Sequence, residues 1–262
     1  MVNREQNKQV GIFCTLYKGS IFIEEYLKNI VSQTFFNKTN FYILDCASPD
    51  GEYEIIKKYL DYPNIKYKKL EKDPGLYAGW NICVDWTQEE YIGNWNVDDR
   101  KTPWSIEVLT KALLKNKSLD LVYGQTLVTN KANDCWDKYK SKQIYPCLPH
   151  SFENLLKNNS PHCMPIWRRD LHDKFGYFNE DYKTASDTDM WLRVCEGGAN
   201  MKFVNEIVGL YYDNPNGRST NKEKLQELIL EVNKVRDLYR NDTNNSGNKK
   251  LSEGFSFNEE NL

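Results

Sequence analysis

The first hundred residues alternate short apolar runs rich in β-formers with stretches whose apolar residues recur at helical spacing. Runs at 9–15, 41–45, 65–70 and 91–97 have the length and composition of buried strands. This alternation is typical of βαβ units, in which strands lie side by side in a mainly parallel sheet and helices cover its faces. The sequence therefore predicts a Rossmann-like α/β domain.

Helical patterns connect and follow these strands. After Ser20, which is expected to cap the helix, apolar residues recur at i, i+3 and i+4 spacing up to Val31. Further helices are expected at 53–60 and from about residue 103, the latter followed by a strand at 119–124. Residues 130–165 are irregular and contain proline, so they are expected to form loops of the kind in which specificity usually resides.

The length of 262 residues suits one large domain, which we predict over residues 1–220. A helix is predicted at 221–240, and the polar tract 241–262 is predicted to be disordered. That helix has an apolar stripe and a polar face that mixes Glu and Lys. This mixture favours docking on its own domain, whereas a partner-binding or membrane-surface helix is the alternative.

The overall charge and the cysteine pattern exclude several classes of protein. A net charge of -2 gives no positive field for tracking phosphates, so a nucleic-acid partner is not expected. The seven cysteines lack any C-x-x-C pair and indicate reduced thiols rather than a disulfide framework or a zinc site. The chain shows neither the apolar core of a signal peptide nor an apolar run of about 18 residues. We expect a cytoplasmic protein without a transmembrane segment, compatible with peripheral membrane contact.

Carboxylates fall at the ends of two predicted strands. Asp45 ends the second strand, and Asp98 and Asp99 follow the fourth. Ligands of such sheets bind at the carboxyl ends of the strands, so folding should bring these acids to one rim. Adjacent carboxylates suit Mn²⁺ or Mg²⁺, hard cations that prefer oxygen ligands and stabilise charge on a leaving group. The sequence thus predicts a metal-assisted site at this rim.

Two acidic segments resemble conserved blocks of family 2 glycosyltransferases, which have the type A (GT-A) fold and invert the sugar's configuration. WNVDDRKTP resembles the family's D-x-D-D-x-x-x-P segment, with Asn96 in place of the first Asp and Pro103 in register. FYILDCASPDG is similar to D-D-G-S-T-D-G, with Cys46 in place of the second Asp. The resemblance implies that Asp98 holds the metal and the donor diphosphate and that Asp45 accepts a hydrogen bond from the donor's uracil ring.

Two further blocks imply donor contacts. VGIFCTLYKG is similar to the family's opening strand, which usually ends P-T-Y-N, and EKDPGLYAGWN resembles the block D-K-G-I-Y-D-A-M-N. Together with Asn96, the residues in register are predicted to bind the donor: Thr15, Tyr17, Asp73, Gly75, Tyr77 and Asn81. An ordinary turn is the alternative for Asp-Pro-Gly. The resemblance spans roughly residues 8–220 and implies a donor-binding half at about 8–100 and an acceptor-binding half at about 101–220.

A fifth block implies the catalytic base. TASDTDMWLR resembles the E-D-x-D-L-W-L-R helix start, in which an Asp is the general base; the matching residue is Asp187, and Ser186 stands where Glu is usual. Inversion by direct displacement needs one carboxylate near the incoming hydroxyl, which fits this role. The alternative is that Asp187 only caps the helix. Trp191 and Arg193 on the same helix are predicted to bind the acceptor, although Trp at this spacing is also typical of a core.

The last block, YYDNPNGRS, is similar to the family's Y-R-x-H-P-x-S-x-S loop, whose His contributes to the metal or diphosphate site. Asn214 occupies that place and is predicted to be a third metal ligand beside Asp98 and Asp99. An amide oxygen ligates hard cations but lacks the basicity of imidazole. Arg218 is predicted to compensate by contacting phosphate. The three histidines of the chain are expected to be loop residues.

These features predict a metal-dependent, inverting glycosyltransferase that moves a sugar from a nucleotide-diphosphate donor, a UDP-sugar, to a hydroxyl of a glycan, lipid-linked glycan or protein. A nucleotidyltransferase is disfavoured because no Gly-rich, basic loop follows the first strand. The second alternative is an inactive sugar-nucleotide-binding or scaffold protein, to which the departures from the family pattern would point. The presence of Asp45, Asp98 and Asp187, each with a separate task, favours the enzyme.

Overall fold

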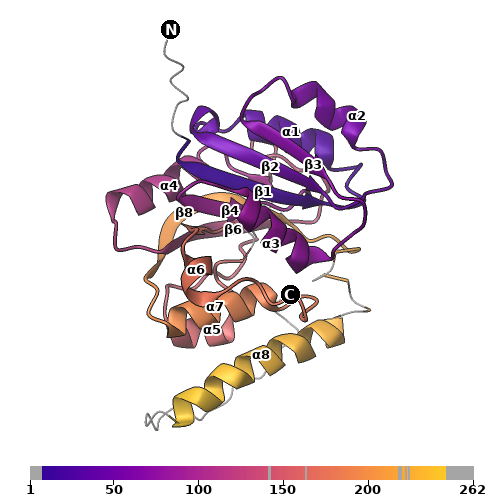
Figure 1. Ribbon diagram of the computed structural model, residues 1–262. Helices are drawn as coiled ribbons and strands as arrows, with labels where there is room; N and C mark the ends of the chain where they lie inside the picture. The colour runs from indigo at the N-terminus through magenta and orange to yellow at the C-terminus, as the bar shows by residue number, and fades with distance from the viewer. Residues whose placement is uncertain are drawn as a thin grey trace.

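The structure, a computed structural model, describes residues 8–140, 143–162, 164–217, 220–221, 223 and 225–245. They form an α/β fold in which helices cover both faces of an eight-stranded sheet (Figure 1). This architecture confirms the predicted fold class. Arg218 and residues 246–262, for which the sequence predicts phosphate binding and disorder, lie outside the described residues.

The sheet is mixed, with strand order β3-β2-β1-β4-β7-β6-β8-β5. The strands are β1 (Val10–Leu16), β2 (Thr39–Asp45), β3 (Ile65–Lys69), β4 (Tyr91–Asn94), β5 (Arg100–Lys101), β6 (Leu121–Thr129), β7 (Ile166–Arg168) and β8 (Met201–Tyr212). Strands β1 to β4 run parallel, whereas β7 is antiparallel to both β4 and β6. The parallel half, built by the first hundred residues, is the part that the sequence pattern predicts strand by strand.

The helices alternate with the strands through most of the chain. They are α1 (Ile23–Val31), α2 (Tyr53–Ile56), α3 (Leu76–Trp86), α4 (Ser105–Lys115), α5 (Phe152–Lys157), α6 (Leu171–Phe175), α7 (Ser186–Glu196) and α8 (Leu225–Asn245), with short 3-10 turns at Phe36–Lys38 and Lys57–Tyr59. The sequence analysis does not predict α3, which follows Asp-Pro-Gly. At this point the Asp73 carboxylate accepts from the Gly75 N–H, and the chain passes directly into the helix.

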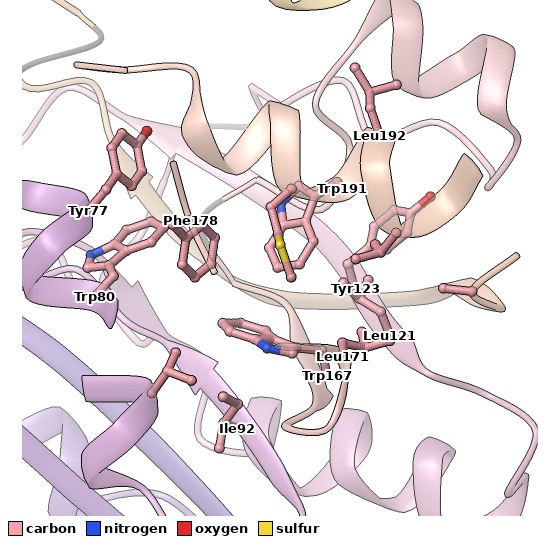
Figure 2. Close-up of a cluster of buried hydrophobic side chains, with 14 of the residues drawn as sticks. Tyr77, Trp80, Ile92, Leu121, Tyr123, Trp167, Leu171, Phe178, Trp191 and Leu192 are labelled. Carbon is pink, nitrogen blue, oxygen red and sulfur yellow. The ribbon is translucent and has the colours of Figure 1, made fainter. Parts of the chain in front are cut away.

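Two hydrophobic cores fill the space on the two faces of the sheet. Along β1, Ile12 and Cys14 face the core beneath α1, α2 and α4, whereas Phe13 faces the core shared with α3 and α5 to α8, as the two-residue period of a strand requires. Figure 2 shows the second core, where aromatic rings of α3, β7 and α7 gather. Trp167 of β7 lies at its centre, with its ring centroid 5.2 Å from that of Trp191.

The long helix α8 docks on α7 along one face (Figure 1). Val235 is fully buried and Tyr239 is 8% exposed, while Ile229 and Leu230 on other faces are 44% and 70% exposed. The helix is five residues longer than the predicted 221–240 at its C-terminal end and starts four residues later. Because Ile229 is exposed, the apolar stripe predicted from the sequence is wider than the face of α8 that packs on the domain.

Two local details differ from the sequence-based expectations. Ser20 does not cap α1, because the N-cap position is Phe22 and the Ser20 hydroxyl donates instead to Asp50 at 3.1 Å. The interval 130–165 is not wholly irregular, since it contains α5, whose N-cap Ser151 accepts from the backbone N–H of Asn154. No helix of the described residues is long and apolar enough to cross a bilayer.

Candidate functional site

The rim of the parallel half carries the predicted donor residues. Strands β1 to β4 run in the same direction, so their carboxyl ends lie along one edge, with Leu16 paired to Asp45 and Phe13 to Asn94. The loops that leave these ends hold the remaining acids and the start of α3. Sequence segments that are far apart are thus brought to one edge, where ligands of α/β sheets bind.

Asp45 closes the end of β2 and is 1% exposed. Its carboxylate accepts hydrogen bonds from the Ser48 backbone N–H at 2.7 Å and from the Tyr67 hydroxyl at 2.6 Å, and Lys69 Nζ lies 3.5 Å away. The Tyr67 contact contributes, after burial, to raising the pKa of that phenol. In this conformation both carboxylate oxygens are engaged inside the protein, so Asp45 shapes the loop that follows it.

The loops after β1 and β2 are tied to each other. Glu52, 2% exposed, accepts from the Gly19 backbone N–H at 2.8 Å and from the Ser48 hydroxyl at 2.7 Å. The predicted donor residue Thr15 lies against α3, where its methyl group would sit 3.0 Å from a Cβ placed on Gly79. Tyr17, two residues further and just past the end of β1, is 46% exposed. Of these two predicted donor residues, Tyr17 is therefore the one that is open to a ligand.

The block around α3 begins with an exposed residue, Asp73, and ends with a half-buried one, Asn81. Asp73 is exposed and accepts from the Gly75 backbone N–H at 2.9 Å, and Gly75 has φ +89°, a left-handed conformation that favours glycine. Asn81 faces the other way. Its amide donates to the Phe178 carbonyl and to Glu180, both at 2.9 Å, and its carbonyl accepts from the Phe178 N–H. Asn81 thus fastens α3 to the segment before α7, an arrangement that occupies its amide.

The two adjacent acids after β4 point in different directions. Asp99 is 1% exposed, and its oxygens accept from the Tyr212 backbone N–H at 3.0 Å and from the Asn96 amide at 3.2 Å. Burial, and next the neighbouring Asp98, raise the pKa of Asp99 to about 8. Asp99 joins the loop after β4 to the end of β8, which leaves it poorly placed as the second metal ligand that the sequence predicts.

Asp98 is less buried and meets the predicted third ligand. Asn214, 116 positions further along the chain, donates its amide N–H to the Asp98 carboxylate at 3.3 Å. Burial raises the pKa of Asp98, and the hydrogen bond from the Asn214 amide and the charge of the Arg100 guanidinium oppose this shift only in part. Within the described residues no cluster of three or more His, Cys, Asp or Glu side chains could hold a metal ion, so Asp98 and Asn214 stay the candidate cation ligands.

Asp187 lies in the first turn of α7 and is partly buried. Its carboxylate accepts from the Asn159 amide at 2.8 Å, from the Thr188 N–H at 2.8 Å and, at a longer 3.4 Å, from the Tyr77 hydroxyl. Burial raises the pKa of Asp187, while these donors lower it. The N-cap residue is Ala185, so Asp187 is a first-turn residue rather than the cap.

The two predicted acceptor residues are part of the protein interior or its framework. Trp191 is 1% exposed and packs edge-on against Trp167 and Phe178 (Figure 2). Arg193 donates to the Phe175 and Tyr177 carbonyls and forms an ion pair with Asp189 at 3.1 Å. Trp191 is therefore a core residue, which corrects its predicted acceptor role. The Arg193 guanidinium holds the segment between α6 and α7, and its predicted acceptor contact stays a prediction.

Several residues around the site carry no signal in the sequence. Asn159 donates to Asp187 from a stretch without a motif, and Tyr212 donates to Asp99 through its backbone N–H.

His172 is not a loop residue, because it lies in α6 and accepts from the Trp167 indole at 3.0 Å. Burial lowers the pKa of His172 to about 4. The six cysteines within the described residues are free thiols, as predicted.

Relatives with known names match most of this chain but only part of their own length. The chondroitin synthase of Pasteurella multocida (strain Pm70) is 24% identical over 234 residues, which is 84% of this chain and 22% of the synthase. The hyaluronan synthase of Pasteurella multocida is 26% identical over 208 residues, 76% of this chain and 20% of the synthase. The chain therefore spans about a fifth of the length of these relatives.

Solved structures share the fold at low sequence identity. S. aureus TarS 1-349 in complex with UDP-GlcNAc has a TM-score of 0.68 at 16% identity, covering 88% of this chain and 70% of that one. Mannosyltransferase PcManGT from Pyrobaculum calidifontis, in complex with GDP-Man and Mn²⁺, has a TM-score of 0.65 at 14% identity, covering 93% and 77%. Because the glycosyl transferase family 2 profile matches residues 12–175, more than half of the sequence, the chain belongs to glycosyl transferase family 2.

Proposed function

We propose that this glycosyltransferase is metal-dependent and inverting, and that it moves a sugar from a UDP-sugar to a hydroxyl of a glycan-type acceptor. The observation that carries the proposal is the contact between Tyr77 and Asp187, which are 110 positions apart. It joins the block that resembles the family's donor site to the residue that resembles its general base. The same helix α3 lies against the end of β1, where Gly79 is close to Thr15.

On the donor side, Asp98 and Asn214 would hold the cation. Asp98 offers a desolvated carboxylate, and half a turn of the Asn214 amide would present its oxygen in place of its N–H. A bound Mn²⁺ or Mg²⁺ supplies electrostatic stabilisation of the diphosphate as it leaves. Asp99 would not bind the cation itself. Its hydrogen bond with the Tyr212 N–H would hold the loop that carries Asp98 against the end of β8, the strand that leads to Asn214.

On the acceptor side, Asp187 would accept the proton of the attacking hydroxyl. Asn159 and Thr188 fix the orientation of the carboxylate, and its raised pKa makes it a stronger base than an exposed Asp. The acceptor is proposed to be a glycan or lipid-linked glycan, a class suggested by the names of the two synthases. A cytoplasmic location, with peripheral membrane contact for a lipid-linked acceptor, fits this proposal.

Titration calorimetry of UDP with and without Mn²⁺, combined with slow hydrolysis of a UDP-sugar, tests the proposal. We expect UDP binding that requires Mn²⁺ and hydrolysis that is lost in Asp187→Asn. Metal-dependent UDP binding without hydrolysis or transfer by the wild-type protein would instead support the inactive sugar-nucleotide-binding protein. A UDP affinity that is the same with and without Mn²⁺ would overturn the proposed role of Asp98.

A further inference from the structure

Glu231 of α8 binds the chain segment that leads into α7. Its carboxylate accepts from three successive backbone N–H groups, those of Lys183 at 2.8 Å, Thr184 at 2.7 Å and Ala185 at 2.9 Å. The Thr184 hydroxyl donates a fourth hydrogen bond at 2.7 Å. These bonds lower the pKa of Glu231, which keeps its charge in spite of partial burial. One side chain, 46 to 48 positions away, thus fixes this entire entry segment.

The N-terminus of α7 has no cap of its own. Its N-cap residue Ala185 lacks a side-chain acceptor, and the unpaired N–H groups at a helix start favour a negative charge. Charge-assisted hydrogen bonds of this kind are stronger than neutral ones. Glu231 accepts from the N–H groups of the N-cap Ala185 and of the two residues before it, so it fixes the entry to α7 and places a negative charge near the helix start.

A second residue of α8 binds the far side of the same turn. The Tyr239 hydroxyl, eight positions after Glu231, donates to the Asp189 carboxylate at 3.0 Å. Between the two contacts Val235 is fully buried. Asp187 lies between Ala185 and Asp189, so α8 holds the backbone on both sides of it, although no described contact links the carboxylates of Glu231 and Asp187.

We propose that Glu231 is a positioning residue for Asp187, and this inference rests on the proposed role of Asp187 as the general base. Without the Glu231 carboxylate, three backbone N–H groups lose their acceptor, and the turn that carries Asp187 loses its fixed start. The contacts of Asp187 with Asn159 and Tyr77 depend on that placement. A displacement of about 1 Å at a reacting group lowers the rate by about 100-fold.

The test compares steady-state transfer, with Mn²⁺ and UDP-sugar, in wild type, Glu231→Ala, Glu231→Gln and the control Glu227→Ala. Glu227 is exposed on the same helix, one turn earlier. We expect Glu231→Ala to lower kcat by about 10- to 100-fold with unchanged donor KM and unchanged Mn²⁺-dependent UDP affinity. Glu231→Gln, which keeps one acceptor oxygen, should recover part of the loss, and Glu227→Ala should match wild type.

A double-mutant cycle separates positioning from general damage. If Glu231 acts through Asp187, adding Glu231→Ala to Asp187→Asn should cost no further activity. An additive loss, a Glu231→Ala variant as fast as Glu227→Ala, or a parallel loss of UDP affinity would each overturn the inference. Full activity of Asp187→Asn would instead overturn the proposed function, an outcome that the single Asp187 variant reveals without any change at Glu231.

Discussion

The two halves of the molecule are assembled in different ways. In the donor-side half, from β1 to β4, each strand pairs with another of the same half and the site residues lie at strand ends. In the acceptor-side half, the segment around Asp187 is held by residues from three other places: Tyr77 of α3, Asn159 and, through the backbone, Glu231 of α8. The strands of the first half are placed by local chain order, whereas the loop after β4 and the start of α7 are held by long-range polar contacts.

This difference teaches which properties each half controls. A site at the ends of paired strands is rigid because the sheet itself fixes it. A site held by side chains from distant segments depends on every one of those contacts. We therefore expect substitutions on the donor side to change ligand binding, and substitutions on the acceptor side to change turnover or stability while donor binding persists.

The largest expected effect is a contrast between Asp98→Asn and Asp187→Asn. Asp98→Asn removes the carboxylate that would hold the cation and should abolish Mn²⁺-dependent UDP binding, with turnover reduced at least about 1000-fold. Asp187→Asn should lower turnover by about 100- to 10,000-fold with UDP affinity unchanged. Calorimetry with UDP and a transfer assay measure both properties. Equal loss of UDP affinity in the two variants would break the division between the halves.

The sequence predicts the donor-side fold well for a physical reason. Strand and helix periodicity is a local property, and parallel strands connected by helices order themselves next to one another. The rim position of Asp98 follows from this, as does its approach to Asn214 once the family resemblance is added. What periodicity does not reveal is orientation: Asp98 and Asp99 are neighbours, yet Asp99 turns inward to the Tyr212 N–H.

The acceptor side is harder to read from sequence because its contacts are non-local. Nothing around Asn159 or Glu231 marks them as partners of the α7 start, since hydrogen bonds across 28 and 46 positions leave no periodic pattern. Trp191 illustrates the opposite error. The family resemblance suggested an acceptor contact, while its helical spacing from apolar neighbours fitted the core where the structure places it.

Trp191→Ala sharpens the comparison through stability. Removing this fully packed ring from the core between β7 and α7 should reduce the free energy of unfolding by about 3–5 kcal/mol. The half-buried Trp136 provides the control, because Trp136→Ala should cost clearly less. Urea denaturation measures both. A large rise in acceptor KM with wild-type stability would restore the acceptor role of Trp191.

The pH dependence of stability tests the contact between the donor-side loop after β4 and strand β8, where Asp99 accepts from the Tyr212 N–H. Because the pKa of Asp99 is raised from 3.8 to about 8, the folded state binds more protons than the unfolded state between these values. The metal-free protein should therefore lose stability as the pH rises from about 4 to 8. Thermal unfolding across this range should show a falling midpoint that Asp99→Asn flattens. A midpoint that rises over the same range would contradict the raised pKa.

The smallest effect is expected on α8, at a residue that contributes no polar contact to its docking. Arg236 is 7% exposed, and its Nε is buried without a hydrogen-bond partner within the described residues. Burial, and next Arg240, lower its pKa. A buried charge without a partner costs stability, so Arg236→Met should be neutral or stabilising by about 1 kcal/mol, a rise of about 2–4 °C in Tm.

The matched variant for this test is Arg240→Met, which removes an exposed arginine whose partner Asp237 lies at 2.8 Å on the same helix. Its Tm should stay close to that of wild type, because exposed ion pairs contribute little. If α8 docks through Glu231, Val235 and Tyr239, neither arginine variant should change turnover. A lower Tm together with lower turnover in Arg236→Met alone would contradict this expectation. It would mean that the Arg236 charge helps to hold α7, so that the acceptor-side half depends on one more contact from a distant segment.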